Sequence, residues 1–362
     1  MKRPKLLMIV NFFPPSAGGG VYRPLSFVKY LSRLSWDITV VTSSPGEFWI
    51  SDPELESQVP SNVRVVRTRS FSGLRILNKL KGGGSSRRSS TRFDILRKIS
   101  ELVFVPDTYI GWVPFAKRAA EKLCRKEKFD IIYSTSPPDS SHLVARSISR
   151  SFHIPWIADF RDPWIFLHLR RPPSPIHKRW HQHLERSVAR ADRVVVTTEG
   201  HRNMFLDLYP DARVERVSNG YDEEDFEGIE KEKPEPGPFT ILHSGLLTLG
   251  RTVEPFLLGL RRFLEERPGA RESIRVSFIG IHESRNEECA RRLGLDDIVS
   301  LEDSAAHNEC LKRAKRSHVL LMIKHDDERY RVIIPAKLYE YIGARRPILG
   351  LVQGGEAADL IK

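Results

Sequence analysis

The chain has 362 residues, 40% of them hydrophobic, with 24 prolines and 23 glycines, and this ordinary globular composition suffices for two domains with separate cores. Its net charge of +12 suits nucleic acid, an anionic membrane face or an anionic substrate as a partner. Three widely spaced cysteines fit neither a disulfide framework nor a metal knuckle, which favours a reducing compartment. No apolar run reaches the roughly 20 residues of a membrane span, and the N-terminal apolar run is too short for a signal peptide.

The first half of the chain alternates apolar, strand-like runs with helix-like stretches. We expect strands at residues 6–10, 36–42, 63–66, 129–134, in the first part of 155–164, at 191–198 and at 214–218. We expect helices at 22–34, 115–126, 143–151, within 170–190 and at 199–208. Such alternation predicts βαβ units and a parallel sheet.

A glycine cluster separates the first predicted strand from the first predicted helix. It consists of Gly18, Gly19 and Gly20. Strand, glycine loop and helix in this order let a backbone approach phosphate or sugar closely. The spacing is not Gly-x-Gly-x-x-Gly, so it predicts no dinucleotide fingerprint, and a flexible turn is the alternative interpretation.

Residues 67–97 form a basic, irregular stretch with a glycine-serine segment at 82–90. Its composition predicts a mobile loop within a domain and not a linker between domains. Contact with anionic lipid headgroups or with an anionic acceptor is one interpretation, and a merely solvated loop is the other.

Arg161 and Asp162 follow the strand expected near residue 156. Strands of α/β sheets end at the ligand crevice, so both residues are site candidates, with a structural salt bridge as the alternative. Further on, His177 and His181 stand at helical spacing, followed by His183, but no third ligand or carboxylate group accompanies them. We therefore predict packed or solvated histidines and no metal site.

A charged, proline-rich stretch at 230–238 predicts a domain boundary, which gives domains 1–232 and 233–362. The second half again alternates, with strands expected at 239–245, 274–280, 298–301, 318–323 and 348–352, and helices at 253–267, 287–293, 309–316 and from residue 335. The fold class predicted is α/β, with two Rossmann-like doubly wound domains facing a cleft.

The last predicted helix carries a cation and a carboxylate three residues apart, Lys337 and Glu340, on one helix face. The carboxylate can accept from ribose or sugar hydroxyls, while the lysine and the free amides of the helix start can hold phosphate. A solvated surface pair is the alternative. Downstream, Gly354 and Gly355 stand either beside that phosphate or in a strand-to-helix turn.

Together these motifs resemble retaining, family-4-type glycosyltransferases of the GT-B fold, in particular those that assemble polysaccharides and cell-envelope glycans. The resemblance covers nearly the whole chain. Its main elements are the glycine loop with Arg23, Pro106-Asp107-x4-Trp112 with its Gly111, Asp159-x-Arg161-Asp162, Asn219-Gly220-x-Asp222, and Pro335-x-Lys337-x2-Glu340-Tyr341 followed by Pro347-Ile348.

The chain departs from the family pattern at several positions. Val332 stands where the family has the first glutamate of a Glu-x7-Glu pair, and Leu246 stands where relatives have the first of two cations. Arg251 falls at the position of the second cation. Arg161 stands where many relatives have a histidine near the transferred sugar.

The resemblance implies a role for each candidate residue. Arg251 and Lys337 would hold the donor diphosphate and Glu340 would orient the donor. The other implied donor contacts are Ser244, Gly245, Gly354, Gly355 and the glycine loop Gly18–Gly20, while Arg161 and Asp162 would face the transferred sugar.

The implied activity is that of a cytoplasmic hexosyltransferase, with peripheral contact to the inner face of the membrane as one interpretation. It would move a sugar from a nucleotide-sugar donor to a glycan or lipid-linked acceptor, with retention, without metal or cofactor, and after domain closure. No Asp-x-Asp metal motif is present. Relatives normally continue beyond the equivalent of Lys362 with a helix that returns to the first domain, so we expect either a truncated second domain or an unusually short member of the family.

Two alternatives stay open from the sequence. Leu246, Val332 and the missing C-terminal helix are compatible with an inactive glycosyltransferase-like scaffold. The basic balance also suits a nucleic-acid-binding protein, although the positive residues are dispersed and no binding module is recognisable.

Overall fold

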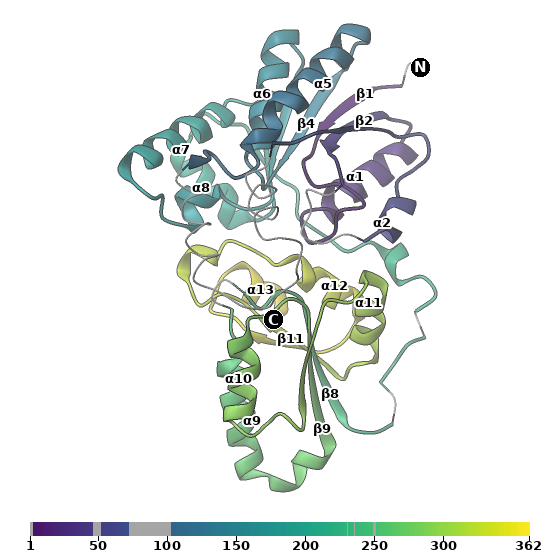
Figure 1. Cartoon of the computed structure of the whole chain (residues 1–362), viewed down its shortest axis with the longest axis vertical. Helices are drawn as coiled ribbons and strands as arrows, with labels where there is room; N and C mark the ends of the chain where they lie inside the picture. The colour runs from purple at the N-terminus through teal and green to yellow at the C-terminus, as the bar shows by residue number, and fades with distance from the viewer. Residues whose placement is uncertain (1–2, 46–51, 72–102, 230, 235, 249–250) are drawn as a thin grey trace. The chain divides into compact units, whose positions relative to one another are not determined.

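The computed structural model describes residues 3–45, 52–71, 103–229, 231–234, 236–248 and 251–362, and the chain divides into two compact units, Met1–Ser218 and Asn219–Lys362. We call them the N-terminal and C-terminal units and describe each by itself; many of their helices and strands are labelled in Figure 1. The predicted basic loop lies mostly outside the described residues, and its segment at 82–90 lies wholly outside them.

The N-terminal unit contains a seven-stranded parallel sheet in the order β3-β2-β1-β4-β5-β6-β7. Its strands are β1 Lys5–Ile9, β2 Asp37–Ser43, β3 Arg64–Thr68, β4 Ile131–Ser136, β5 Trp156–Phe160, β6 Arg193–Val196 and β7 Val214–Arg216. The described helices between them are α1 Tyr22–Arg33, α2 Glu54–Ser57, α5 Val113–Lys126, α6 Ser140–Phe152, α7 Pro175–Val188 and α8 Glu199–Leu208. Apart from the short α2, each matches a predicted element to within a few residues.

The strand β1 shows why this sheet is covered on both faces. Its side chains alternate, so that Leu7 and Ile9 lie in one buried cluster with residues of α5 and α6, while Leu6 and Met8 lie in another with Val28 of α1. A strand buried on both faces is apolar throughout, which is the pattern that predicted it. In Figure 1, α1 accordingly lies on the opposite side of the strands from α5 and α6.

Local capping explains where two of the helices begin. The Ser174 side chain accepts a hydrogen bond from the backbone amide of His177, and Pro175 occupies the first position of α7. The Thr198 hydroxyl accepts in the same way from the amide of His201, so α8 begins at the residue that the sequence predicts.

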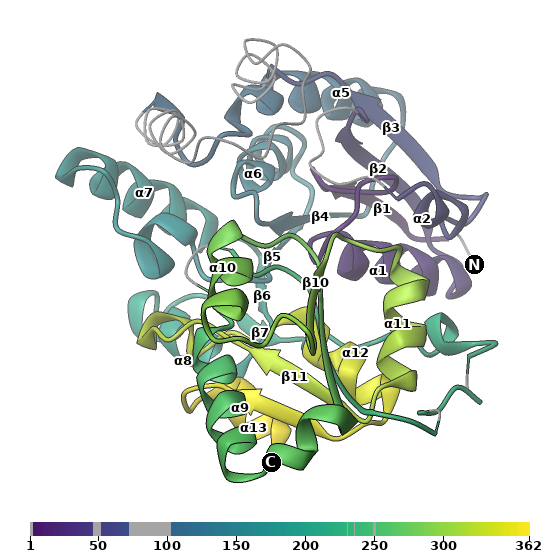
Figure 2. The ribbon, with the colours of Figure 1, turned by 60° about the horizontal axis from the view of Figure 1, so that its bottom comes forward.

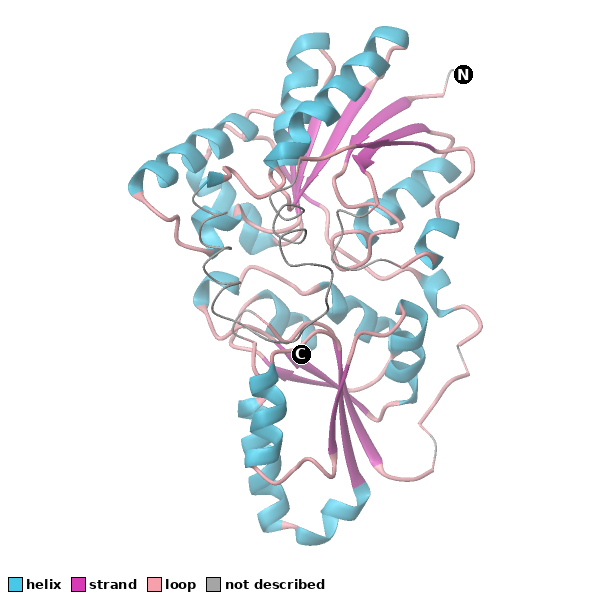
Figure 3. Ribbon diagram, viewed as in Figure 1, coloured by secondary structure: helices cyan, strands magenta, loops and turns pink. Residues whose placement is uncertain are grey.

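The C-terminal unit contains a five-stranded parallel sheet in the order β10-β9-β8-β11-β12. Its strands are β8 Phe239–Ser244, β9 Ile274–Ile279, β10 Val299–Glu302, β11 Val319–Ile323 and β12 Ile348–Leu351. Its α-helices are α9 Glu254–Glu266, α10 Ser284–Arg292, α11 His307–Arg316, α12 Ala336–Ala344 and α13 Glu356–Ile361. The alternation of helix and strand in both units is visible in Figure 3.

The central strand β11 is again buried on both faces. Leu321 and Ile323 belong to the cluster that includes residues of α9 and α10, whereas Leu320 and Met322 belong to the cluster that includes residues of α11 and α12. Figure 2 shows these two helix pairs on opposite sides of the strands. Two doubly wound α/β units are therefore confirmed, while the expected cleft between them stays a prediction.

The structure divides the chain before the predicted boundary at residue 232. Residues that follow Ser218 pack on the C-terminal unit: Phe226 and Ile229 lie in its core, and the rings of Tyr221 and Phe226 lie against Gly343 of α12. The charged stretch at 230–238 predicted a linker from composition alone, whereas packing assigns the residues before it to the second unit. No helix in the described part of the chain is long and apolar enough to cross a membrane.

Candidate functional site

The strand order of the C-terminal unit reverses between β8 and β11, and the crevice at such a reversal is where α/β sheets bind their ligands. Strand β8 ends at Ser244 and is followed by Gly245, while β11 ends at Ile323 and is followed by Lys324. Three of the predicted donor-binding residues, Ser244, Gly245 and Lys337, come together here.

Gly245 makes room for the amine of Lys337. Its φ angle is +134°, which L side chains rarely adopt, and a Cβ at this position would lie 2.3 Å from Lys337 Nζ. The lysine amine thus occupies the space that any other residue at position 245 would fill. This close approach gives the predicted glycine a specific role.

His243, one residue before the end of β8, holds the lysine amine. Its Nδ1 lies 2.8 Å from the backbone oxygen of Leu321, and its Nε2 lies 3.1 Å from Lys337 Nζ. A carbonyl oxygen only accepts, so Nδ1 carries the proton and Nε2 accepts from the lysine. Burial, followed by the charge of Lys337, holds the pKa of His243 well below its ordinary value.

The charge on Lys337 is poorly solvated. Although part of the side chain is accessible, protein atoms surround its amine, and burial lowers its pKa to about 7. The nearby Arg251 acts in the same direction, and Glu340 opposes both. An anion placed here would therefore find a cation with little competing solvation.

Arg251 is oriented by two further contacts. Its Nε donates to Nε2 of His325 at 3.1 Å, and its Nη1 donates to the backbone oxygen of Leu246 at 3.2 Å. The His325 ring in turn stacks on Tyr330, with ring centroids 4.2 Å apart. These two contacts orient the guanidinium of Arg251, and its contact with phosphate stays a prediction.

Lys324 is a cation that the sequence analysis missed. It follows β11 directly, and burial, followed by the charge of Arg331, lowers its pKa to about 8 against the opposing effect of Glu356. Only its position at the end of the central strand could have indicated it.

Glu340 lies one turn beyond Lys337 on α12, as its spacing predicted. Its Oε1 is 3.1 Å from Nε2 of His307, and a quarter of its side chain is exposed. The next residue, Tyr341, is buried, and its hydroxyl accepts from the backbone amide of Ser244 at 2.8 Å. Helix α12 is thereby tied to the end of β8, which brings the cation and the carboxylate to the same edge of the sheet.

Gly354 and Gly355 form a strand-to-helix turn, one of the two interpretations that the sequence left open. Gly355 has φ +97°, and a Cβ there would lie 2.7 Å from the backbone oxygen of Arg331. That same oxygen accepts from the amide of Glu356 at 3.1 Å. Contact of these glycines with a donor stays a prediction.

In the N-terminal unit, Arg161 is buried beneath the glycine loop. A Cβ on Gly20 would lie 2.8 Å from its Nη1, and its Nε donates to the backbone oxygen of Ser136 at 2.9 Å. Its Nη2 donates to the backbone oxygen of Pro137. The structure thus brings Arg161 and Gly20 together and gives the arginine a part in shaping the glycine loop, while Gly18 has the left-handed φ of +108° that such a turn requires.

Arg23 and Asp159 form a buried ion pair in the same unit, which sequence reasoning did not single out. Nε and Nη2 of Arg23 donate to the Asp159 carboxylate at 3.0 and 2.8 Å, and Asp159 also accepts from Tyr133 at 2.6 Å and Thr135 at 2.9 Å. Burial alone would raise the pKa of Asp159, but Arg23 and these donors outweigh it and lower that pKa. The Asp-x-Arg-Asp motif thus begins with a residue that joins α1 to the sheet.

The histidines of α7 are packed or solvated, as predicted: His177 and His181 are buried and His183 is exposed. His181 is buried, and its Nδ1 accepts from Trp164 Nε1 at 2.9 Å, while burial lowers the pKa of His181 to about 4. No group of three or more potential metal ligands occurs among the described residues.

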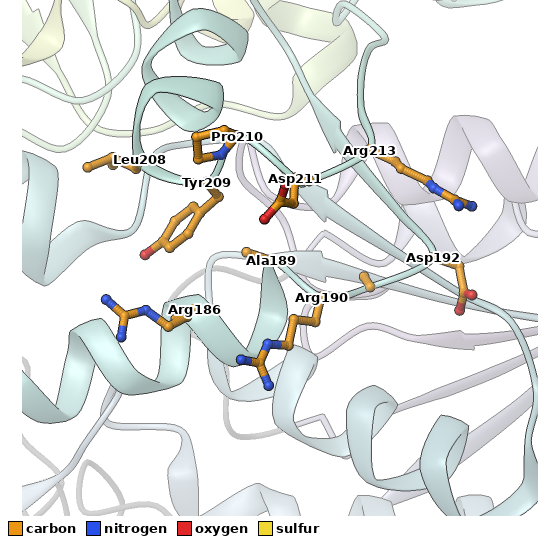
Figure 4. A pocket seen from close by; sticks show the side chains of 11 residues that line it. Arg186, Ala189, Arg190, Asp192, Leu208, Tyr209, Pro210, Asp211 and Arg213 are labelled. Atoms are coloured by element: carbon orange, nitrogen blue, oxygen red, sulfur yellow. The ribbon is translucent and has the colours of Figure 1, made fainter.

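A pocket of about 500 Å³ lies elsewhere in the N-terminal unit (Figure 4). Its walls come from the C-terminal ends of α7 and α8 and from the residues just before β6 and β7, including Arg190 and Tyr209. These are the amino ends of the strands, whereas ligands of such sheets bind at the carboxyl ends. None of the predicted site residues lines this pocket.

Comparison with known proteins assigns the family. Residues 18–220, more than half of the chain, match the family of glycosyl transferase 4-like domains. The chain belongs to the glycosyl transferase 4-like family. This match includes the glycine loop, Arg161 and Asp162. No curated protein sequence matches the chain significantly.

Solved structures support the same fold across both units. Sucrose-phosphate synthase from Thermosynechococcus elongatus is 12% identical with a TM-score of 0.63, and the match covers 98% of this chain and 82% of that one. Trehalose 6-phosphate synthase from Burkholderia multivorans is 13% identical with a TM-score of 0.64, covering 99% and 84%. HepE from Anabaena, in complex with UDP and glucose, is 14% identical with a TM-score of 0.61, covering 99% and 83%.

At these identities the structural neighbours show the fold alone, which is the GT-B architecture of two Rossmann-like units. The glycosyl transferase 4-like family adds that the chain is a glycosyltransferase. The roles of the site residues stay predictions, since these comparisons do not address them.

Proposed function

We propose that this glycosyl transferase 4-like chain binds a nucleoside-diphosphate sugar at the crevice of its C-terminal unit and transfers the sugar to a glycan or lipid-linked acceptor. The observation that carries the proposal is the meeting of Lys337, Arg251 and Gly245 at the point where the strand order reverses. A further support is that HepE, one of the similar structures, binds UDP and glucose.

Each side chain has a role in this proposal. Lys337 and Arg251 bind the diphosphate and stabilise the charge that develops on it as the sugar leaves. Glu340 accepts hydrogen bonds from the ribose or sugar hydroxyls. Because two cations are present to neutralise the leaving group, we propose a reaction that requires no divalent metal.

The finer features of the reaction are proposals of the same kind. We propose a hexosyl donor, retention of the anomeric configuration, and an acceptor of polysaccharide or cell-envelope glycan assembly at a membrane face. We also propose that Asp162 and the glycine loop of the N-terminal unit contact the sugar, with Arg161 supporting that loop through Gly20.

Calorimetry of the full chain with UDP, GDP and ADP tests the proposal. We expect one of the three to bind, with binding unchanged by a chelator of divalent metals. Arg251→Ala and Lys337→Ala should each weaken that binding by about 10-fold or more, since a charge-assisted hydrogen bond contributes roughly 1.5–3 kcal/mol.

Arg262→Ala is a matched control, because Arg262 lies on α9 with an exposed side chain that pairs with Glu266. This variant should bind the nucleotide like the wild type. Failure of all three nucleotides to bind the folded chain would exclude the proposed function.

A further inference from the structure

Lys337 donates to an unusual hydrogen-bond acceptor, the imidazole of His243. Buried lysine amines are commonly paired with carboxylates, which neutralise them. Here the acceptor at 3.1 Å is a neutral imidazole nitrogen, so the hydrogen bond fixes the ammonium without cancelling its charge.

The imidazole of His243 is fixed in one orientation and one tautomer. His243 is fully buried, its Nδ1 proton is engaged by the Leu321 backbone oxygen, and its ring lies 6.0 Å from that of Phe278. Turning the ring over would put ring carbons in place of both nitrogens and lose both hydrogen bonds, and the other neutral tautomer would place a lone pair against the carbonyl oxygen and an N–H against the lysine ammonium. Both contacts are repulsive, so a single orientation and tautomer are selected.

We propose that His243 is a positioning residue, whose neutral imidazole holds the Lys337 ammonium against Gly245 and sets how strongly the crevice binds an anionic diphosphate. The identity of that anion rests on the proposed function, whereas the effect of His243 on Lys337 does not.

The surroundings make this control sensitive to pH near neutrality. Lys337 faces His243 from β8, Arg251 from the segment after β8, and Glu340 from its own helix. Two of these three neighbours do not compensate its charge, and its pKa of about 7 means that the amine of the ligand-free protein is largely neutral at pH 8. Binding of a diphosphate should then draw a proton onto Lys337, so the KM for the donor should rise between pH 6.5 and 8.5.

Two substitutions of His243 distinguish the effect of its hydrogen bond to Lys337 from the effect of merely having a polar side chain at this position. In His243→Asn the shorter amide can still donate to the Leu321 oxygen but does not reach Lys337. In His243→Gln the longer side chain brings an amide oxygen to the place of Nε2. We expect His243→Asn to weaken nucleoside-diphosphate binding by about 10-fold and His243→Gln to restore most of it. The turnover number should change less than KM.

A measurement without nucleotide tests the same proposal. Competitive acylation with isotope-labelled acetic anhydride, read by mass spectrometry across pH 5–10, gives the pKa of the Lys337 amine. Loss of the acceptor should lower that pKa in His243→Asn relative to the wild type, and His243→Gln should return it.

The two readouts separate failure of this inference from failure of the proposed function. A Lys337 pKa that is the same in the wild type and in folded His243→Asn would overturn the role of His243, whatever the nucleotide data. If the pKa shifts as expected but no nucleotide binds, the proposed function fails and the positioning role stands. If His243→Asn does not fold, the comparison is made between the wild type and His243→Gln, which must agree.

Discussion

At the scale of single residues, the cation of Lys337 lies in a site that solvates it poorly. Its amine is enclosed beside Gly245, close to Arg251, and lies 3.1 Å from Nε2 of the neutral His243, which accepts its hydrogen bond. Such an arrangement destabilises the empty protein and becomes favourable when an anion arrives. We infer that this site gains affinity for an anion and lowers the stability of the ligand-free protein.

Replacing Lys337 by methionine should therefore stabilise the chain at pH 7 by roughly 1–4 kcal/mol, the range found when buried charges give way to apolar groups of similar size. The folded pKa of about 7 lies below the ordinary 10.5, so the unfolded chain holds more protons between these values. Wild-type stability must then rise with pH across that window. The advantage of Lys337→Met should shrink between pH 7 and pH 9 in urea unfolding, and a constant or growing advantage would contradict the buried-cation account.

The site shows at the same scale what the sequence can and cannot predict. Lys337 and Glu340 are found from spacing on one helix, because both belong to a local motif. His243 cannot be found in this way, because its partner Lys337 lies 94 residues further along the chain and only the fold brings the two together. Asp159 was part of a recognised motif, but its pairing with Arg23, 136 residues away, is equally invisible before folding.

At the scale of elements, the Pro106–Trp112 motif has a structural explanation. Asp107 accepts from the backbone amide of Ser140 at 2.8 Å and from its hydroxyl at 2.6 Å, and so caps α6 from a distant segment. Gly111 packs against the backbone of Phe71, while Trp112 is fully buried and donates to Thr68 at 2.7 Å. The motif therefore contacts both the end of β3 and the start of α6 and holds these two elements in place.

Asp107→Ala should consequently destabilise the chain by about 2 kcal/mol, the upper range for loss of a helix cap. Asp107→Asn keeps an amide oxygen that can accept from the Ser140 amide, so this variant should lose less than half as much free energy of unfolding. Urea unfolding of both variants measures this difference. Equal losses for alanine and asparagine would show that the cap contributes little.

Element positions were largely predictable because strands buried on both faces and amphipathic helices leave distinct apolar patterns. The domain boundary was less so, since Phe226 and Ile229 precede the charged stretch in sequence yet pack in the core of the C-terminal unit. Composition marks where a chain is polar, whereas packing decides which core a short apolar segment joins.

For the whole molecule, family and fold agree on a glycosyltransferase built from two Rossmann-like units. The N-terminal unit carries the family match, and the C-terminal unit carries the crevice with its cations. The central claim is that this crevice recognises a diphosphate through Lys337.

The most direct test is the ratio of affinities for a nucleoside diphosphate and for its parent nucleoside, measured by calorimetry on the full chain and on Lys337→Met. We predict that the diphosphate binds the wild type far more tightly than the nucleoside. Lys337→Met should lower that ratio by about 10-fold or more while leaving the affinity for the nucleoside unchanged. A ratio that is the same in both proteins would contradict the account.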